Sequence, residues 1–247
     1  MSTKSEDIQK WIQEKRANTE LSLSNDFSSA DYAGFTNLYE HIEIEHRGRC
    51  FVELIQNCHD ANRDKSDRKG KVWFLWTDSA LLVGDNGSGF TLADVQSICT
   101  PGTSSKKGDS QTIGYKGVGF VAVYELSDCP EIYTHHGFGF GFDRLEAEKK
   151  KIPPMIFPQL LDGSSVGEDK KQIDQIFKNG AKTVIRLPFK EPSFRQSSYE
   201  DFLNSGRPEM LLFMPKIGSV TFTLGEENTE WVCKESKRTY GSGNIVV

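Results

Sequence analysis

The sequence predicts an α+β domain, and two observations carry this prediction. Residues 51–61 place apolar side chains at the i, i+3, i+4, i+7 spacing of a half-buried helix. Residues 71–77 and 80–84 are apolar runs separated by Asp78 and Ser79, which is the spacing of a β-hairpin. Helices and antiparallel hairpins in one chain of 247 residues are typical of this class.

The composition excludes several classes of protein. Hydrophobic residues make up 36% and charged residues 26% of the chain, as in soluble globular proteins. A net charge of −5 argues against a basic surface for nucleic acid. No stretch approaches about 18 apolar residues, so we expect no membrane span, and the N-terminus lacks a signal peptide's apolar core. Five cysteines without CxxC spacing predict reduced thiols in a cytoplasmic protein.

The N-terminal part is expected to contain helices and one long loop. Residues 4–18 are helix-compatible and carry a short apolar side. Residues 19–36 are rich in Ser, Asn, Asp and Gly, which predicts a loop. A helix is expected to begin near Asn37 and to break at Gly48, just before the helix at 51–61.

Further elements follow from alternation and turn residues. Thr91 is a candidate N-cap for a short helix, with Asp94 three residues later. Residues 100–113 are small and polar, so we expect a mobile segment. Strands are expected at 131–134, 137–142, 183–188, 219–224 and 229–234. Helices are expected at 121–126, 171–178 and 199–213.

The helix at 51–61 also begins a polar stripe. Glu53, Asn57, Asp60 and Asp64 follow one another at i, i+4, i+7 and i+11, and at roughly 100° per residue they stay within about 60° of one another. Taken alone, this is the solvated face of an amphipathic helix. A helix-borne carboxylate can also activate water beside a phosphate, and a carboxamide oxygen suits Mg²⁺.

Two glycine-containing motifs come later in the chain. No GxxxxGK[ST] sequence is present, which excludes a P-loop. Asp85 ends a predicted strand and could accept a hydrogen bond from the amine of a base, while Gly87 and Gly89 let a flat ring approach the backbone. The loop GYKGVGF at 114–120 opens a predicted helix. Its free amides, the helix dipole and Lys116 suit a polyphosphate.

In this order and spacing, with Thr183 in a later strand, the motifs resemble the Bergerat nucleotide fold of the GHKL superfamily. That superfamily includes gyrase, the large heat-shock chaperone, histidine kinases and the mismatch-repair MutL proteins. Four segments most resemble the N-terminal ATPase-like domain of sacsin and its bacterial and plant relatives: RGRCFVELIQNCHDAN, IGYKGVGFVAVYELSDCPEIYTHHGFGFGFD, TVIRLPF and LLFMPKIGSV. The resemblance covers about residues 40–225.

The resemblance implies a fold and a domain division. The fold is a two-layer α/β sandwich with a mixed, mostly antiparallel sheet and helices on one face. Residues 1–36 would form an N-terminal helix and extension. Residues 37–247 would form the Bergerat-fold ATP-binding domain, with a lid at about residues 96–113. We expect this domain to be the N-terminal part of a longer protein.

The resemblance also implies roles for single residues. Glu53 matches the water-activating glutamate, Asn57 the Mg²⁺ ligand and Asp85 the adenine-specifying aspartate. Thr183 matches the strand threonine that contacts adenine through water. The residues expected to bind ATP are Asn57, Asp60, Ala61, Asp85, Gly87, Gly89, Ser105, Lys106, Gly114, Lys116, Gly117, Val118, Gly119, Phe120 and Thr183.

Some assignments stay open at the level of sequence. Ala181 fits the chaperone pattern better than Thr183 does, whereas Thr183 fits the sacsin-like TxxRxP pattern. Lys106 cannot be distinguished from Lys107 as the lid lysine, and Lys116 is either a phosphate contact or a solvated loop lysine. The motif residues after Asn57 depart from the family pattern at Cys-His, and we expect both to face the core or the helix flank.

The resulting expectation is an ATP-binding, Mg²⁺-dependent ATPase that turns over slowly in isolation. It would act as an ATP-driven conformational clamp in a chaperone-like or defence-related larger protein, with ATP and Mg²⁺ as its ligands. The alternative is a nucleotide-sensing module that hydrolyses little ATP. A homodimer could form through the lid and the N-terminal segment. The sequence identifies neither a client nor further domains.

Overall fold

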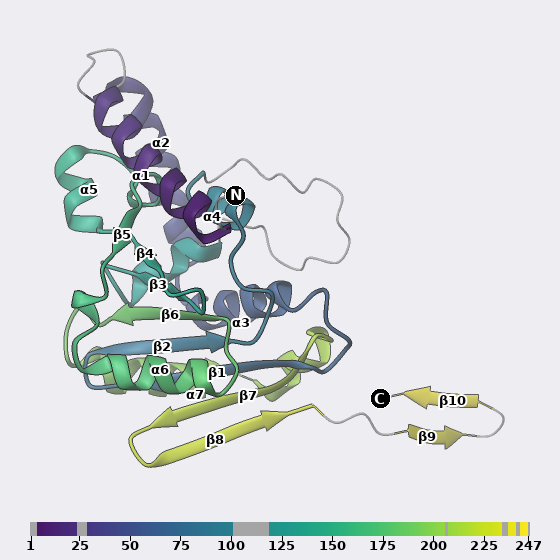
Figure 1. Cartoon of the computed structure of the whole chain (residues 1–247). Helices are drawn as coiled ribbons and strands as arrows, with labels where there is room; N and C mark the ends of the chain where they lie inside the picture. Colours follow the sequence, from purple (N-terminus) through teal and green to yellow (C-terminus); the bar gives the residue numbers. More distant parts are fainter. Residues whose placement is uncertain are drawn as a thin grey trace.

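Eight strands form one mixed sheet, and most of the helices pack on one of its faces (Figure 1). The computed structural model describes residues 4–23, 29–100, 119–205, 207–233, 237–240 and 243–246. The strand order is β5-β4-β3-β6-β2-β1-β7-β8, and neighbours are antiparallel except for the parallel pair β1 and β7. The predicted α+β class and the mixed, mostly antiparallel sheet are thereby confirmed.

The strands of this sheet are β1 (Gly70–Trp76), β2 (Ala80–Asp85), β3 (Glu131–Thr134), β4 (Gly139–Gly141), β5 (Gln159–Leu161), β6 (Thr183–Pro188), β7 (Ile217–Leu224) and β8 (Glu227–Val232). A separate two-stranded sheet contains β9 (Lys237–Tyr240) and β10 (Gly243–Val246). The α-helices are α1 (Lys4–Leu23), α2 (Ser29–Glu45), α3 (Cys50–Ala61), α4 (Leu92–Ile98), α5 (Arg144–Lys150), α6 (Lys170–Lys178) and α7 (Phe194–Ser205). The 3₁₀-helices are η2 (Gly119–Glu125), η3 (Pro154–Ile156), η4 (Ser164–Asp169) and η5 (Pro208–Phe213).

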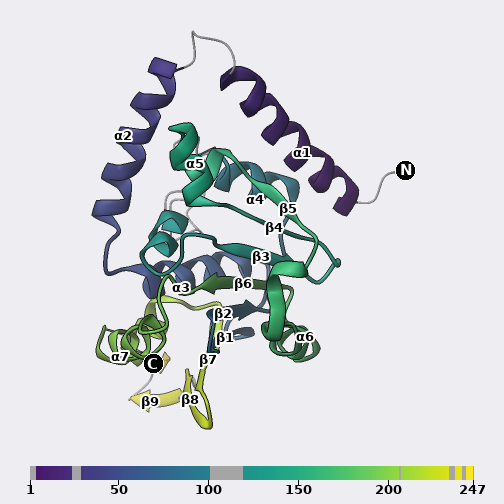
Figure 2. The same cartoon turned by 90° about the vertical axis from the view of Figure 1, so that its left-hand side faces the viewer.

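Alternation along the strands divides the apolar side chains between two cores. Phe74 and Trp76 of β1 enter the main core, whereas Trp73 and Leu75 of the same strand face the other side of the sheet. The main core contains residues from α1, α2, α3, α4, η2 and α7, which form the helical layer of the predicted sandwich. On the opposite face α6 covers a smaller core (Figure 2). One helix, α6, therefore lies on the opposite face of the sheet from the main helical layer.

An aromatic contact fixes the rotation of α3 against the sheet. Phe51 on α3 packs on Phe202 of α7, with ring centroids 4.8 Å apart, and lies 6.1 Å from Phe74 of β1. Leu54 and Ile55 are fully buried beside it. Because the apolar stripe of α3 is held in the main core, its polar stripe is carried round toward the ends of β2 and β6.

The loop predicted at residues 19–36 is wrong, because α1 continues to Leu23 and α2 begins at Ser29. Hydroxyl groups in this part bond back to the preceding helical turn. Thr19 Oγ1 donates to the Lys15 carbonyl at 2.9 Å, and Ser22 Oγ donates to the Thr19 carbonyl at 2.9 Å. Polar side chains that satisfy themselves in this way need not end a helix.

Helix α5, which was not predicted, links the two N-terminal helices (Figure 2). Arg16 of α1 forms a two-pronged ion pair with Glu146 of α5 at 2.7 and 2.9 Å. Arg144 of α5 contacts Glu43 of α2 at 2.8 Å. These pairs tie α1 and α2 to the same element, so both helices are placed relative to the sheet.

Other predicted elements agree with the structure except at their ends. The β1–β2 hairpin is present, and the break at Gly48 is confirmed by a positive φ of 75° after α2. The helix predicted at 121–126 is the 3₁₀-helix η2, and the one predicted at 199–213 is divided between α7 and η5. Strand β5 was not predicted. Among the described helices, none has the length and apolar character needed to cross a membrane.

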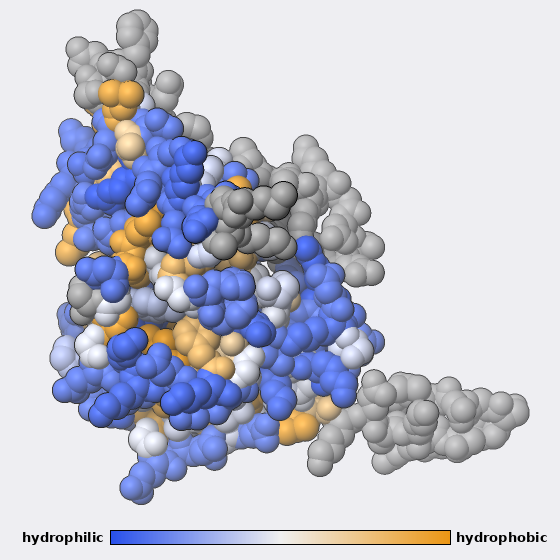
Figure 3. Space-filling model, in the orientation of Figure 1, coloured by the Kyte–Doolittle hydropathy of each residue, from blue (hydrophilic) through white to orange (hydrophobic). Residues whose placement is uncertain are grey.

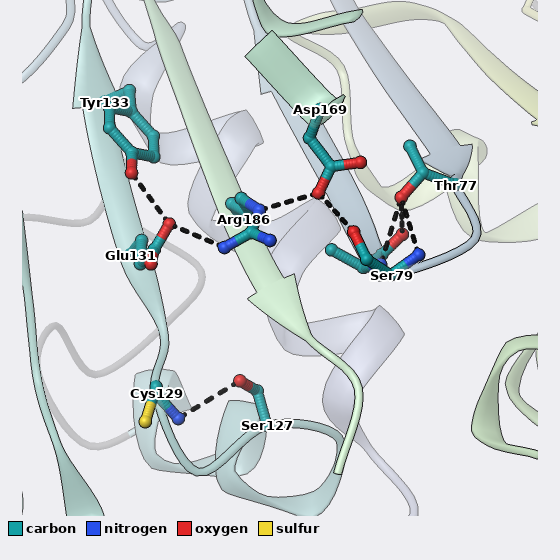
Figure 4. A network of polar contacts seen from close by, with 9 residues as sticks. Thr77, Ser79, Ser127, Cys129, Glu131, Tyr133, Asp169 and Arg186 are labelled. Atoms are coloured by element: carbon teal, nitrogen blue, oxygen red, sulfur yellow. Dashed lines mark hydrogen bonds and ion pairs between the residues drawn. The ribbon is translucent and has the colours of Figure 1, made fainter. Parts of the chain in front are cut away.

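A network of charged and polar side chains is buried on the sheet face that carries α6 (Figure 4). Arg186 of β6 bonds to Asp169 at 2.8 Å and to Glu131 of β3 at 3.0 Å. Tyr133 donates to Glu131 at 2.7 Å, and Ser79 donates to Asp169 at 2.6 Å. The network joins β3, β6, the end of η4 and the β1–β2 turn, so it fixes the smaller core to the sheet.

Candidate functional site

A pocket lies where the C-terminal half of α3 meets the ends of β2 and β6. Its volume is about 160 Å³, below the roughly 300–1,000 Å³ of typical small-molecule sites. The part formed by the described residues therefore has room for one flat ring system. The lining residues are Asn57, Cys58, Asp60, Ala61, Arg63, Asp64, Asp85, Ser88, Gly89, Phe90, Thr91, Asp94, Ser97, Ile98, Phe120, Thr183 and Ile185.

Sheet register brings Asp85 and Thr183 together, although 97 residues separate them in the sequence. Asp85 is the last residue of β2, Thr183 is the first residue of β6, and the two are direct partners across the antiparallel pair. Asp85 lies two residues after Val83, and Thr183 lies two residues before Ile185. Val83 and Ile185 both face the main core, and residues two apart in a strand share a face. Their side chains therefore share the sheet face that α3 covers, and both line the pocket.

Asp85 is a buried carboxylate with little compensation. Its side chain is 6% exposed and accepts one hydrogen bond, from the Gly87 amide at 2.7 Å. No other described residue donates a hydrogen bond to it, and Lys65 acts on it only through its charge. Burial raises the pKa of Asp85 to about 6, with Gly87 and Lys65 opposing that shift. One carboxylate edge is thus open to a donor that enters the pocket.

The turn after Asp85 docks on the end of α3. The Ser88 amide donates to the Ala61 carbonyl at 2.8 Å. A Cβ on Gly87 would lie 2.6 Å from that same carbonyl oxygen, so only glycine allows this approach. Gly89 has a positive φ of 76° and lines the pocket. The two motifs singled out in the sequence therefore form one wall.

The residues of the polar stripe that begins on α3 have different surroundings. Asn57 and Asp60 line the pocket, and the Asn57 carboxamide makes no hydrogen bond with the residues that the structure describes. Asp60 is buried, with its Oδ1 3.2 Å from His59 Nδ1. His59 is itself buried and does not line the pocket. Asp64 lies in the turn after α3, which ends at Ala61, and it reaches the pocket from there.

Glu53 lies one turn before Asn57 and is buried at the start of η2. Its Oε1 is 3.2 Å from both His46 Nδ1 and Arg49 Nη2. A Cβ on Gly119 would collide with Glu53 Oε2. Phe120, the next residue, lines the pocket. The predicted catalytic glutamate and the end of the predicted phosphate loop are therefore in contact.

Of the two candidates for the strand threonine position, Thr183 lines the pocket, whereas Ala181 packs in the smaller core on the other face of the sheet.

Other predicted positions lie outside the part of the chain that the structure describes. The lid from residue 101 onward lies outside the described residues. The same holds for the predicted ligands Ser105, Lys106, Gly114, Lys116, Gly117 and Val118.

Sequence reasoning missed part of the pocket lining. Thr91, Asp94 and Ser97 follow one another at i, i+3 and i+6, the spacing of one helix face, and that signal was available. Ile185 shares the face of Thr183 at a spacing of two. Thr91 and Asp94 also form a complete capping box at the start of α4, which holds this wall in place.

A second groove, of about 550 Å³, lies on the other face of the sheet between α6 and β3–β5. Figure 3 shows apolar surface in this region, bordered by hydrophilic residues. Its lining includes Tyr133, Phe138, Ile173 and Phe177, and no predicted ATP ligand contributes to it. Within the described part of the chain, no group of three or more His, Cys, Asp or Glu side chains is arranged to hold a metal ion.

Comparison with known proteins identifies the family of this chain. Residues 36–236 match the Sacsin domain family. Protein NO VEIN of Arabidopsis thaliana is 29% identical over 178 residues, which is 69% of this chain and 6% of that protein. Chaperone protein HtpG of Buchnera aphidicola subsp. Cinara cedri (strain Cc) is 27% identical over 148 residues, or 55% of this chain and 20% of that protein.

The chain thus matches only a small part of the length of either relative. The Sacsin match covers most of the chain and includes α3, both strands of the pocket and η2. The predicted resemblance to sacsin-like domains related to the GHKL ATPases is confirmed, and the chain is an ATPase-like, chaperone-related domain that belongs to the Sacsin domain family.

Proposed function

We propose that this domain binds ATP with the adenine in the pocket and hydrolyses it with the help of Mg²⁺. The observation that carries the proposal is Asp85, a buried carboxylate with one free edge, placed beside Thr183 in a pocket sized for a flat ring. A protein buries such a group at a cost unless a ligand supplies the missing donor. The HtpG relationship supports the same class of ligand.

Adenine is the base that suits this acceptor. Adenine carries an exocyclic N6 amine donor, whereas guanine places the O6 acceptor at the equivalent position. Two acceptors facing each other would leave the buried carboxylate unpaired, so guanine is disfavoured. Gly89 and Ala61 line the pocket, and the close approach of Gly87 to Ala61 holds these two segments together beside the place where the ring would lie. Thr183 lines the pocket, and its hydroxyl would contact the adenine side through water.

Asn57 would hold Mg²⁺ on the phosphate side of the pocket. Its carboxamide is free of hydrogen bonds to described residues and is partly exposed at the pocket wall, which fits a cation that takes one or two protein oxygens and keeps several waters. When bound, Mg²⁺ would neutralise charge on the phosphates.

Glu53 would be the general base. Its Oε1 is held by His46 and Arg49, and its Oε2 faces Gly119 at the end of the phosphate loop. It would take a proton from water as the water oxygen bonds to the γ-phosphorus. The bond from that phosphorus to the bridging oxygen breaks, which gives ADP and phosphate. The reaction needs no group beyond those of the chain, water and the metal nucleotide.

Residues 96–113 would act as a lid that closes over the bound nucleotide. Helix α4 gives the lid a fixed base, because its capping box and the buried Val95 and Ile98 hold it to the core. We infer that closure makes the domain an ATP-driven clamp with slow turnover in isolation. The domain would act in a cytoplasmic, chaperone-like or defence-related protein, with the lid and α1 as the surface for a homodimer.

Phosphate release from Mg·ATP under multiple-turnover conditions tests the proposal, with Glu53→Ala as the comparison. We expect wild type to release phosphate and Glu53→Ala to lose that activity while it still binds ATP. If both proteins bind ATP and neither turns over beyond the uncatalysed rate, the domain is a nucleotide sensor instead. If neither binds ATP, the adenine assignment fails as well.

A further inference from the structure

The turn between α2 and α3 is built so that two of its side chains meet the same carboxylate oxygen. Helix α2 ends at Glu45, and residues 46–49 form a turn before α3. His46 Nδ1 and Arg49 Nη2 each lie 3.2 Å from Glu53 Oε1. An ionised carboxylate only accepts hydrogen bonds, so His46 Nδ1 carries the proton in this pair. Glu53 Oε1 is therefore held by a hydrogen bond from His46 and by an ion pair with Arg49.

The other oxygen of Glu53, Oε2, lies beside Gly119 at the start of η2. Glu53 Oε2 is the atom nearest to the position of a Cβ on Gly119. The described charged or titratable groups around Glu53 are His46, Arg49, Cys50 and, beyond Cys50, Glu125. No described residue donates a hydrogen bond to Oε2. The two oxygens thus have different surroundings: one is fixed and the other faces the start of η2.

Backbone hydrogen bonds hold the turn that carries His46 and Arg49. The Arg49 amide donates to the His46 carbonyl at 3.1 Å, and the Glu53 amide donates to the Arg49 carbonyl at 3.0 Å. Gly48 has a φ of 75°, a conformation that favours glycine, and its amide donates to Glu125 Oε2 at 3.0 Å. Because Glu125 belongs to η2, this bond links the turn to the 3₁₀-helix that begins at Gly119.

We propose that His46 and Arg49 are positioning residues for the reaction of Glu53. They hold Oε1, so that Oε2 stays directed at Gly119, where it takes the proton from the attacking water. This inference rests on the proposed ATPase function and adds two residues to which the sequence assigned no role. Correct placement of a reacting group within about 1 Å can change a rate by a factor of about 100.

His46 and Arg49 are expected to contribute unequally to kcat. The side chain of His46 is 18% exposed and that of Arg49 is 53% exposed. An exposed ion pair is screened by solvent and contributes less. His46→Ala should therefore lower kcat by about 10- to 100-fold, and Arg49→Ala by only a few fold. Neither residue lines the pocket, so the Kd for ATP should stay unchanged.

Three variants distinguish positioning from simple structural support. His46→Asn returns a donor near the place of Nδ1, so it should restore most of kcat. Arg47→Ala removes a charge from an exposed side chain of the same turn, for which no ion pair is observed, and it should turn over like wild type. In a Glu53→Gln background His46→Ala should cause no further loss, because the carboxylate that it positions is gone.

Steady-state phosphate release and ATP titration on the full 247-residue chain decide the matter. The expected result is a lower kcat with unchanged Kd for His46→Ala and recovery in His46→Asn. If Glu53→Ala abolishes turnover but His46→Ala retains the wild-type kcat, the positioning role is overturned and the ATPase stands. If wild type and Glu53→Ala release phosphate at the same rate, hydrolysis by Glu53 is overturned and the positioning role falls with it.

Discussion

The two faces of the central sheet bury carboxylates in opposite ways. On the α6 face, Glu131 and Asp169 share the guanidinium of Arg186, and Tyr133 and Ser79 complete their hydrogen bonds (Figure 4). On the α3 face, Asp85 has one backbone amide and no ion pair among the described residues. Strand β6 contributes to both faces, since Arg186 and Thr183 point to opposite sides.

This difference distinguishes a buried charge that stabilises the fold from a buried charge that is open to a ligand. A compensated network stabilises the fold only while all its members are present, because one missing partner leaves a buried charge. A carboxylate without a partner destabilises the free protein and becomes favourable when a ligand supplies a donor. The network on the α6 face therefore stabilises the fold, whereas on the α3 face Asp85 keeps one carboxylate edge without a donor among the described residues. The following substitutions test this contrast, from the largest expected effect to the smallest.

Replacing Arg186 should have the largest effect on stability. Arg186→Met leaves Glu131 and Asp169 buried without their cation, which typically costs about 3–5 kcal/mol. Chemical unfolding in urea measures the loss. Lys71→Met, at an exposed position of β1, is the control and should change stability by less than about 0.5 kcal/mol. Equal stabilities for the two variants would remove the structural role of the network.

Replacing Asp85 should increase the stability of the folded protein, whereas replacing Arg186 should lower it. The pKa of Asp85 is raised by burial to about 6, so Asp85→Asn should stabilise the folded protein by up to about 3 kcal/mol at pH 7. The stability that the protonated group contributes is full below about pH 4 and is lost as pH rises through 6. The advantage of Asp85→Asn should thus grow from pH 4 to pH 7.

Glu131→Gln makes the same chemical change on the other face and provides the contrast. Glu131 is bonded to Arg186 and Tyr133, so its neutralisation should lower the free energy of unfolding. Unfolding curves of both variants between pH 4 and pH 7 give the comparison. Destabilisation by Asp85→Asn at pH 7 would contradict the claim that this carboxylate lacks compensation.

Gly119→Ala should affect turnover more than stability. The added Cβ would collide with Glu53 Oε2, so the carboxylate must shift away from its working position. We expect phosphate release to fall by at least about 10-fold, with a loss of about 1–3 kcal/mol in stability from overpacking. Gly34→Ala, where a Cβ meets nothing within 4 Å, is the matched control and should retain full activity. Normal turnover of Gly119→Ala would indicate that Glu53 takes no part in the reaction.

Thr183→Val should have the smallest effect. The change keeps the shape of the side chain and removes one hydroxyl from the pocket. A single hydrogen bond contributes about 0.5–1.5 kcal/mol, so the Kd for ATP should rise by roughly 2- to 10-fold. Thr134→Val is the control in the neighbouring strand, because the Thr134 hydroxyl donates to the Phe138 carbonyl outside the pocket. Calorimetric titration would detect the difference, and equal Kd values would remove Thr183 from the site.

Much of the fold was predictable because its signals are local. The α3 stripe, the β1–β2 hairpin and the strand at Thr183 each follow from periodicity or turn residues within a short window. The missed elements depend on distant contacts. Helix α5 is held by Arg16 and Glu43 from other helices, and Thr19, in the part of α1 predicted as a loop, also reaches the carbonyl of Ile156 at 3.4 Å.

The site divides in the same manner. Motifs supplied Asp85, Gly87 and Asp60, since each belongs to a recognisable local pattern. No motif indicated that His46 would reach Glu53, because their contact depends on the angle between α2 and α3. That angle follows from the Gly48 turn and its bond to Glu125 of η2, which a sequence pattern does not encode.

The central claim is that the open edge of Asp85 recognises the amine of adenine. Titration of the chain with a non-hydrolysable ATP analogue and with the matching GTP analogue, each with Mg²⁺, tests it most directly. The account predicts saturable binding of the ATP analogue, at least about 10-fold weaker binding of the GTP analogue, and loss of ATP-analogue binding in Asp85→Asn. Equal affinities for the two analogues, or unchanged ATP-analogue affinity in Asp85→Asn, would contradict it.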